Sequence, residues 1–115
     1  MAKTVLIVDD DATVVDLIKN ILGLLGLEAR VTRNGRDALA AVRDSRPDAI
    51  ILDLMMPVMD GWELLDRIGQ AGISVPVVAL SASDTSRVRG RVPVLSKPIG
   101  RDALLRAVRD YVALR

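Results

Sequence analysis

Residues 4–11 of the chain read TVLIVDDD, a continuous apolar run that is followed at once by three acidic residues. An unbroken apolar run of this length is typical of a central strand that is buried on both faces of a sheet. Apolar residues then recur at helical spacing from Val14 to Leu25, and Gly26 stands where a left-handed residue would end the helix. A buried strand followed by an amphipathic helix predicts the first unit of a parallel sheet covered by helices.

The same alternation of strand and helix continues along the chain. Four more strands are expected, at residues 28–32, 49–52, 77–80 and 92–95. Three more helices are expected, at residues 35–43, from 61 to near 72, and at 101–114, and the first two of these follow the capping residues Asn34 and Asp60. Residues 28–32 alternate polar and apolar, and Pro93 cannot donate a hydrogen bond. The second and fifth strands are therefore expected at the edges of the sheet.

These elements predict an α/β fold, a doubly wound, flavodoxin-like parallel sheet of five strands in the order 2-1-3-4-5. The segment from Asp84 to Gly90 has room for about two helical turns, so the fourth helix of such a fold is expected to be shortened or absent. The chain has 115 residues, of which half are hydrophobic, and it is expected to form a single domain over residues 1–115.

The composition excludes several classes of function. Sixteen basic and 15 acidic residues leave a net charge of +1, which gives no electrostatic reason to expect nucleic acid or a membrane surface as a partner. The chain has no cysteine and no histidine, so any chemistry must use carboxylates, hydroxyls or lysine. No apolar run approaches the ~18 residues of a membrane span and the N-terminus does not resemble a signal peptide, so a cytoplasmic protein is expected.

Polar residues stand directly after the predicted strands. Asp9 and Asp10 follow the first strand, Asp53 the third, Ser81 the fourth and Lys97 the fifth. In a doubly wound sheet these strand ends meet at one edge, and ligands bind there beside the switch point between the first and third strands. Crowded carboxylates favour a hard cation such as Mg²⁺, while a lysine and a hydroxyl can hold a phosphoryl group. The pattern therefore indicates Mg²⁺-assisted phosphoryl transfer.

Some of these residues also have simpler interpretations. Asp11, the third acidic residue of the run, is best explained as the cap of the following helix. Taken singly, Ser81 is an ordinary turn hydroxyl and Lys97 an ordinary surface lysine. Met55 and the methionines near it are typical of loop packing rather than of chemistry.

Five short motifs occur in order along the chain: VDD at 8–10, DLMMP at 53–57, DG at 60–61, SA at 81–82 and KP at 97–98. Together they resemble the signatures of the response-regulator receiver family, over residues 4–114. The resemblance implies that Asp53 forms an aspartyl phosphate, and that Ser81 and Lys97 contact the phosphoryl oxygens. It also implies a cis peptide bond between Lys97 and Pro98.

The resemblance further implies a Mg²⁺ site and a set of partners. Asp10 would be a direct ligand, Asp9 would act through water, and Asp53 and the backbone carbonyl of Met55 would complete the protein ligands. A sensor histidine kinase or phosphotransfer protein would supply the phosphoryl group. The chain would act as a signalling switch rather than as an enzyme, as a monomer or weak dimer that signals to a downstream protein.

Two departures from the family concern the output of the switch. Only 15 residues separate Ser81 from Lys97, which is fewer than the family typically has. Val94 stands three residues before the lysine, where the family usually has an aromatic residue whose rotamer reports phosphorylation. We therefore expect phosphorylation to act by ordering residues 83–92, which include arginines 87, 89 and 91.

Three other functions remain open from the sequence. A Mg²⁺-dependent phosphatase of the haloacid-dehalogenase kind places Asp-x-Asp after the first strand, a spacing that Asp9 and Asp11 match, but the chain has no room for a cap domain. A flavodoxin-like nucleotide-binding module needs a glycine-rich loop after that strand, and none is present. A scaffold receiver would bind proteins without phosphorylation. The chain is consistent with a stand-alone receiver and with part of a larger regulator.

Overall fold

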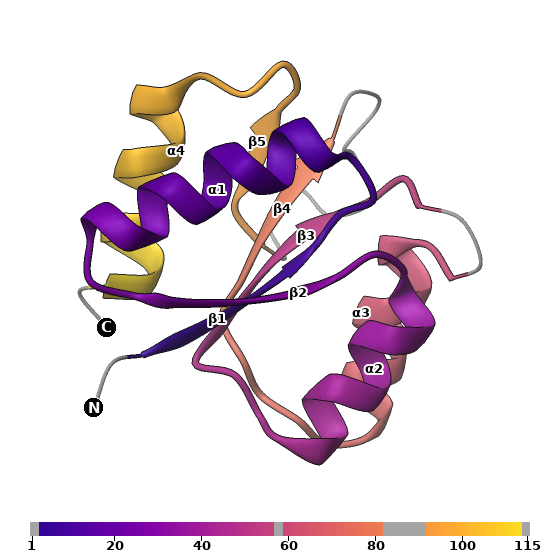
Figure 1. Ribbon diagram of the computed structural model, residues 1–115. Helices are drawn as coiled ribbons and strands as arrows, with labels where there is room; N and C mark the ends of the chain where they lie inside the picture. The colour runs from indigo at the N-terminus through magenta and orange to yellow at the C-terminus, as the bar shows by residue number, and fades with distance from the viewer. Residues whose placement is uncertain (1–2, 57–58, 82–91, 114–115) are drawn as a thin grey trace.

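The sheet of the protein has five parallel strands in the order β2-β1-β3-β4-β5. It is seen in a computed structural model that describes residues 3–56, 59–81 and 92–113 (Figure 1). The strands are β1 (Thr4–Val8), β2 (Glu28–Thr32), β3 (Ala49–Asp53), β4 (Val77–Ser81) and β5 (Val94–Ser96). The predicted strand order is confirmed, including the placement of the second and fifth strands at the edges.

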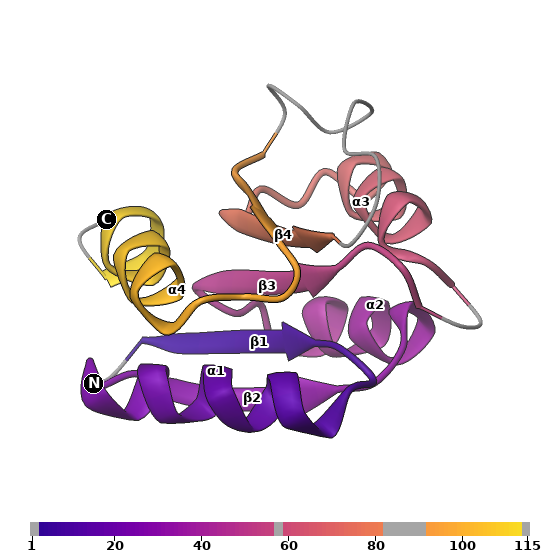
Figure 2. The ribbon, with the colours of Figure 1, turned by 90° about the horizontal axis from the view of Figure 1, so that it is seen from above.

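Helices cover both faces of this sheet. They are α1 (Ala12–Leu24), α2 (Gly35–Asp44), α3 (Gly61–Gln70) and α4 (Arg101–Val108), and α4 continues into a π-helical turn, η1 (Arg109–Ala113). α1 and α4 lie on one face, and α2 and α3 lie side by side on the other (Figures 1 and 2). The central strands are thus enclosed on both sides, as the unbroken apolar runs predict.

Alternate residues of each central strand pack into two separate hydrophobic cores. Leu6 and Val8 of β1 pack with α2 and α3, whereas Val5 and Ile7 pack with α1 and α4. All four side chains are fully buried. Because successive side chains of a strand point to opposite faces, an apolar run of this kind is stable only where both faces are covered. The two cores hold the strand ends rigidly in place.

The predicted starts of α1, α2 and α3 are confirmed by their N-caps. Asp11 Oδ1 accepts a hydrogen bond from the backbone N–H of Thr13 at 2.9 Å, which caps α1. The side chains of Asn34 and Asp60 cap α2 and α3 in the same way. Gly26 has φ 72°, the left-handed value predicted after α1.

Several boundaries differ from the prediction. β3 and β4 each extend one residue further, to Asp53 and Ser81, because the ladder continues past the apolar run. β5 begins at Val94 rather than at residue 92, since Pro93 has no N–H for the ladder, although its carbonyl still accepts from Ala79. The final α-helix ends at Val108 and gives way to η1.

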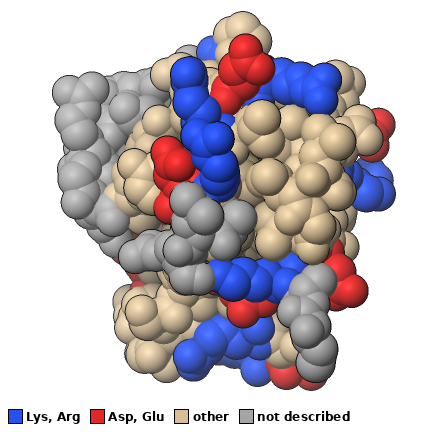
Figure 3. Space-filling view, turned by 90° about the vertical axis from the view of Figure 1, so that its left-hand side faces the viewer, with Lys and Arg blue, Asp and Glu red and all other residues tan. Residues whose placement is uncertain are grey.

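The shortened fourth helix expected at residues 84–90 and the switch segment expected at residues 83–92, except Val92, lie outside the described residues. Within the described ranges, no helix has both the length and the apolar character needed to cross a membrane. On the face drawn in Figure 3, Lys and Arg side chains lie interspersed with Asp and Glu side chains and with uncharged surface.

Candidate functional site

The carboxyl ends of β1, β3 and β4 bring three polar side chains to one edge of the sheet. Asp9 follows β1, Asp53 ends β3 and Ser81 ends β4, and all three residues are buried. These are the buried polar or charged residues of the part of the chain that the structure describes. Burying ionisable groups costs free energy, so their position here indicates function rather than stability.

Lys97 reaches this group from the segment that follows β5. Its Nζ lies 3.2 Å from Asp53 Oδ2 and 3.3 Å from Asp9 Oδ2. The backbone N–H of Lys97 donates to the Ser81 carbonyl at 2.8 Å, and the Lys97–Pro98 peptide bond is cis, as expected. One ammonium group therefore lies between two buried carboxylates.

Backbone amides hold the other oxygen of each carboxylate. Asp9 Oδ1 accepts from the N–H of Asp11 at 2.9 Å, and Asp53 Oδ1 accepts from the N–H of Met55 at 3.0 Å. These bonds fix both side chains and turn each Oδ2 toward Lys97. Asp9 Oδ2 is buried and accepts no hydrogen bond, although the lysine is close enough to form an ion pair with it. The site thus contains an under-coordinated carboxylate oxygen.

The electrostatics of the site follow from this arrangement. Burial raises the pKa of Asp9, and the Asp53 carboxylate adds to that effect, whereas the Asp11 N–H and the Lys97 ammonium oppose it. Burial also works to lower the pKa of Lys97, but the charges of Asp9 and Asp53 outweigh burial and leave that pKa raised. Lys97 therefore stays positively charged at neutral pH.

The acidic residues form a group that suits a divalent cation. One carboxylate oxygen from each of Asp9, Asp10 and Asp53 lies within 4.8 Å of the others. Asp9 and Asp53 are buried and Asp10 is exposed, so the group opens to solvent on one side. The negative charge of three carboxylates exceeds the single positive charge of Lys97. A further cation near the under-coordinated oxygen of Asp9 would balance this charge. These donors fit Mg²⁺, which prefers oxygen ligands and retains water on its open side.

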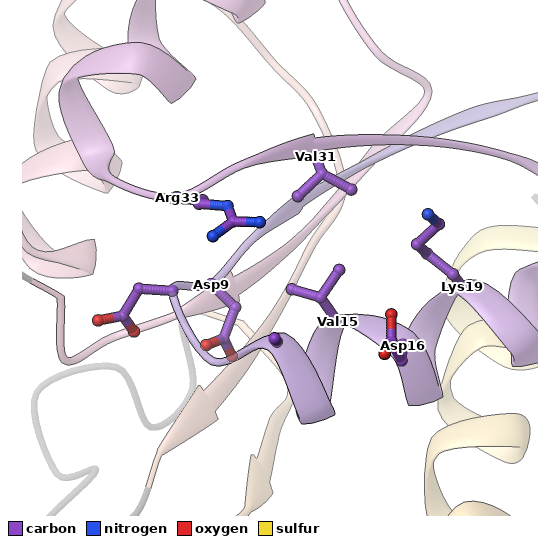
Figure 4. A pocket seen from close by; sticks show the side chains of 8 residues that line it. Asp9, Val15, Asp16, Lys19, Val31 and Arg33 are labelled. Atoms are coloured by element: carbon purple, nitrogen blue, oxygen red, sulfur yellow. The ribbon is translucent and has the colours of Figure 1, made fainter.

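A cavity of about 180 Å³ lies between α1 and the end of β2, and Asp9 and Asp10 of the acidic group line it (Figure 4). Asp9 and Arg33 lie on one side of this cavity, and Lys19 lies on the other side, near Asp16. The two basic residues were not among the predicted site residues. Each is an exposed residue outside the recognisable motifs, so the sequence carries no signal for its position.

The structure brings together the predicted residues Asp9, Asp10, Asp53, Ser81 and Lys97. Met55 follows Asp53 by two residues and is exposed to solvent. Asp11 is not part of the acidic group that could hold a metal, because its side chain caps α1. Its simpler interpretation is therefore confirmed.

Comparison with known protein families assigns the chain to a family. The sequence model described as the response regulator receiver domain matches residues 5–109. The response regulator MprA from Mycolicibacterium vanbaalenii is 33% identical to this chain, and the match covers 95% of this chain and 50% of that protein. MprA from Mycobacterium tuberculosis is 32% identical with the same coverage. The chain spans about half the length of these curated relatives.

Solved structures show the same fold. The receiver domain of the Francisella response regulator 1452 superimposes with a TM-score of 0.85 at 31% identity, covering 95% of each chain. The chemotaxis protein CheY4 from Vibrio cholerae superimposes with a TM-score of 0.84 at 27% identity, covering 97% of this chain and 100% of that one.

Proposed function

This chain belongs to the response regulator receiver domain family of two-component signalling, and from that premise we propose that Asp53 accepts a phosphoryl group in a Mg²⁺-dependent reaction. The observation that carries the proposal is the position of Asp53. It is buried at a strand end, fixed by a backbone N–H and faced by Lys97 at 3.2 Å. The fold alone would not support this conclusion, because the same fold serves many functions.

In the proposed reaction, a carboxylate oxygen of Asp53 attacks the phosphorus atom of the donor. The bond between phosphorus and the donor's leaving atom breaks, and an acyl phosphate forms on Asp53. Lys97 is already beside Oδ2, so its ammonium group can bind an oxygen of the phosphoryl group added there. Ser81 lies at the end of the neighbouring strand β4, and its hydroxyl would donate a hydrogen bond to a second phosphoryl oxygen.

Asp10, Asp53 and the backbone carbonyl of Met55 would hold Mg²⁺ directly, and Asp9 would hold it through water. When bound, Mg²⁺ would supply positive charge to neutralise the transferring phosphoryl oxygens. The fixed orientation of Asp9 and Asp53 supports this arrangement, because their backbone hydrogen bonds leave little freedom to either side chain.

The phosphoryl donor would be a sensor histidine kinase or phosphotransfer protein. The chain has no histidine of its own, so a phosphohistidine must come from a partner. We further propose that residues 1–115 form one receiver domain that acts in the cytoplasm and signals to another protein, as a switch rather than a metabolic enzyme. The output would not use the rotamer of an aromatic residue at this position, because β5 carries Val94 there.

The phosphatase alternative is disfavoured by Asp11. That mechanism would use Asp11 as its acid, but the side chain of Asp11 is engaged as the cap of α1, where it accepts from the N–H groups of Thr13 and Val14.

The proposal is tested by incubating the protein with acetyl phosphate and Mg²⁺ and measuring its intact mass. We expect one phosphoryl adduct, which is lost when Mg²⁺ is chelated beforehand. Asp53→Asn removes the acceptor while keeping the size of the side chain, so it should show no adduct. An equal adduct on the variant would refute the role of Asp53.

A further inference from the structure

The segment between β3 and α3 is anchored by the backbone N–H groups of two glycines. This segment begins at Asp53 and carries Met55. Gly61 donates to the carbonyl of Leu54 at 3.1 Å, which closes the segment on itself. Gly35, from the start of α2, donates to the carbonyl of Met59 at 3.1 Å. The second bond ties the segment to a different part of the chain.

A side chain at Gly35 would remove this contact. A Cβ atom built there would overlap the carbonyl oxygen of Met59 and would lie 2.8 Å from Met59 Cβ. At Gly61 a Cβ atom would lie 2.7 Å from Leu54 Cα and 2.8 Å from the Asp53 carbonyl oxygen. At each glycine the nearest obstructing atom belongs to the backbone, which cannot rotate away. Both glycines are required by close approach of the chain rather than by an unusual φ.

The Gly35 N–H is available because it belongs to the first turn of a helix. The first N–H groups of an α-helix have no carbonyl partner within the helix. The side chain of Asn34 accepts from Asp37, and the Met59 carbonyl accepts from Gly35. Gly35 is buried and Met59 is packed against the core beneath α2 and α3, so water competes poorly for this bond.

We infer that Gly35 is a positioning residue for the metal site, because it holds the segment that carries the Met55 carbonyl. The inference rests on the proposed function, in which that carbonyl is a Mg²⁺ ligand. Mg²⁺ demands a nearly ideal octahedral arrangement of oxygens, so a small displacement of one ligand weakens binding. Leu54, the residue before Met55, is held by Leu80 and Gly61. The Met59 carbonyl, four residues after Met55, adds the bond that ties this segment to α2.

The first test is Gly35→Ala, with Mg²⁺ affinity measured by calorimetry. We expect Kd for Mg²⁺ to rise about tenfold, as for loss of other groups that orient metal ligands. The Mg²⁺ concentration that gives half-maximal phosphorylation should rise equally, while the rate at saturating Mg²⁺ stays within about twofold of the parent rate. Gly23→Ala is the matched control, since nothing lies within 4 Å of its Cβ, and it should bind Mg²⁺ as the parent does. A folded Gly35→Ala variant with the parent's Kd would overturn the inference.

The second test uses the parent protein and does not depend on the folding of a variant. If the Gly35 contact favours Mg²⁺ binding, then Mg²⁺ must stabilise the contact to the same extent. Hydrogen exchange of the Gly35 amide should therefore slow on addition of saturating Mg²⁺, and by more than exchange of the Ser45 amide. Ser45 lies at the other end of α2, where its N–H donates to Ala41, and it reports the general stabilisation of the domain.

The outcomes separate this inference from the proposed function. A parent protein that binds no Mg²⁺ would contradict the proposed function. A parent protein that binds Mg²⁺ while Gly35 and Ser45 gain equal protection would contradict the inference alone.

Discussion

The ammonium group of Lys97 lies 3.2 Å from Oδ2 of Asp53, although the two residues are 44 positions apart in the chain. The Asp53 side chain is 4% exposed and that of Lys97 is 20% exposed, so the pair is largely shielded from water. The lysine therefore already occupies the position from which it can contact a phosphoryl group added to Asp53. The same contact stabilises the unphosphorylated protein, and this gives the first prediction.

Lys97→Met should destabilise the protein, because it leaves two buried carboxylates without their shared cation. We expect a loss of about 2 kcal/mol in the free energy of unfolding at pH 7.5, less than for a fully buried pair because Lys97 is partly exposed. Urea denaturation measures this loss. Arg67→Met is the control, since the Arg67–Glu63 pair is about half exposed and should contribute no more than about 0.5 kcal/mol. Equal stability of Lys97→Met and the parent would contradict the account.

Asp9→Asn should stabilise the protein in the absence of Mg²⁺. The substitution keeps an oxygen for the Asp11 N–H and removes a buried negative charge beside Asp53. We expect a gain of about 1 kcal/mol in the free energy of unfolding at pH 7.5, which is typical of a substitution that relieves an unfavourable charge. Added Mg²⁺ should stabilise the parent and have little effect on the variant. A variant that is less stable than the parent without Mg²⁺ would show that the charge of Asp9 does not destabilise the folded protein.

The advantage of Asp9→Asn should depend on pH. Burial raises the pKa of Asp9 above its ordinary value of 3.8, so the folded protein favours the protonated carboxyl. The ionised form therefore costs stability above the folded pKa, and this cost disappears as the pH falls toward 3.8. Unfolding measured for both proteins from neutral to acidic pH should show the difference shrinking. A difference in the free energy of unfolding that stays constant or grows on acidification would contradict this prediction.

Asp10→Asn should affect Mg²⁺ binding without affecting the fold. The Asp10 side chain is exposed, so its replacement should change the free energy of unfolding by less than about 0.5 kcal/mol. Loss of a direct ligand should weaken Mg²⁺ binding by about tenfold or more. Calorimetric titration of the variant beside the parent measures this effect. Unchanged affinity would exclude Asp10 as a direct ligand.

Most of the fold could be predicted from local patterns in the sequence. The apolar run before Asp9 and the alternation in residues 28–32 encode central and edge positions, and the caps at Asn34 and Asp60 encode helix starts. Strand ends were predicted one residue short because a polar residue such as Asp53 ends the apolar run without ending the hydrogen-bonded ladder.

The chemistry of the site could be predicted only in part. Strand-end positions identified the residues, but the ion pairs of Lys97 depend on how two distant loops meet. The contact between Gly35 and Met59 likewise has no local signal, since a glycine at the start of a helix has several explanations. Such contacts are properties of tertiary structure, so sequence periodicity does not reveal them.

The most direct test of the central claim is to locate the phosphoryl group. Borohydride reduces an acyl phosphate to the corresponding alcohol, so treatment after reaction with acetyl phosphate and Mg²⁺ should convert Asp53 to homoserine. Peptide mass spectrometry should find this change at position 53, and it should be absent without Mg²⁺. Reduction at another carboxylate, or no reduction in a folded protein that binds Mg²⁺, would contradict the account.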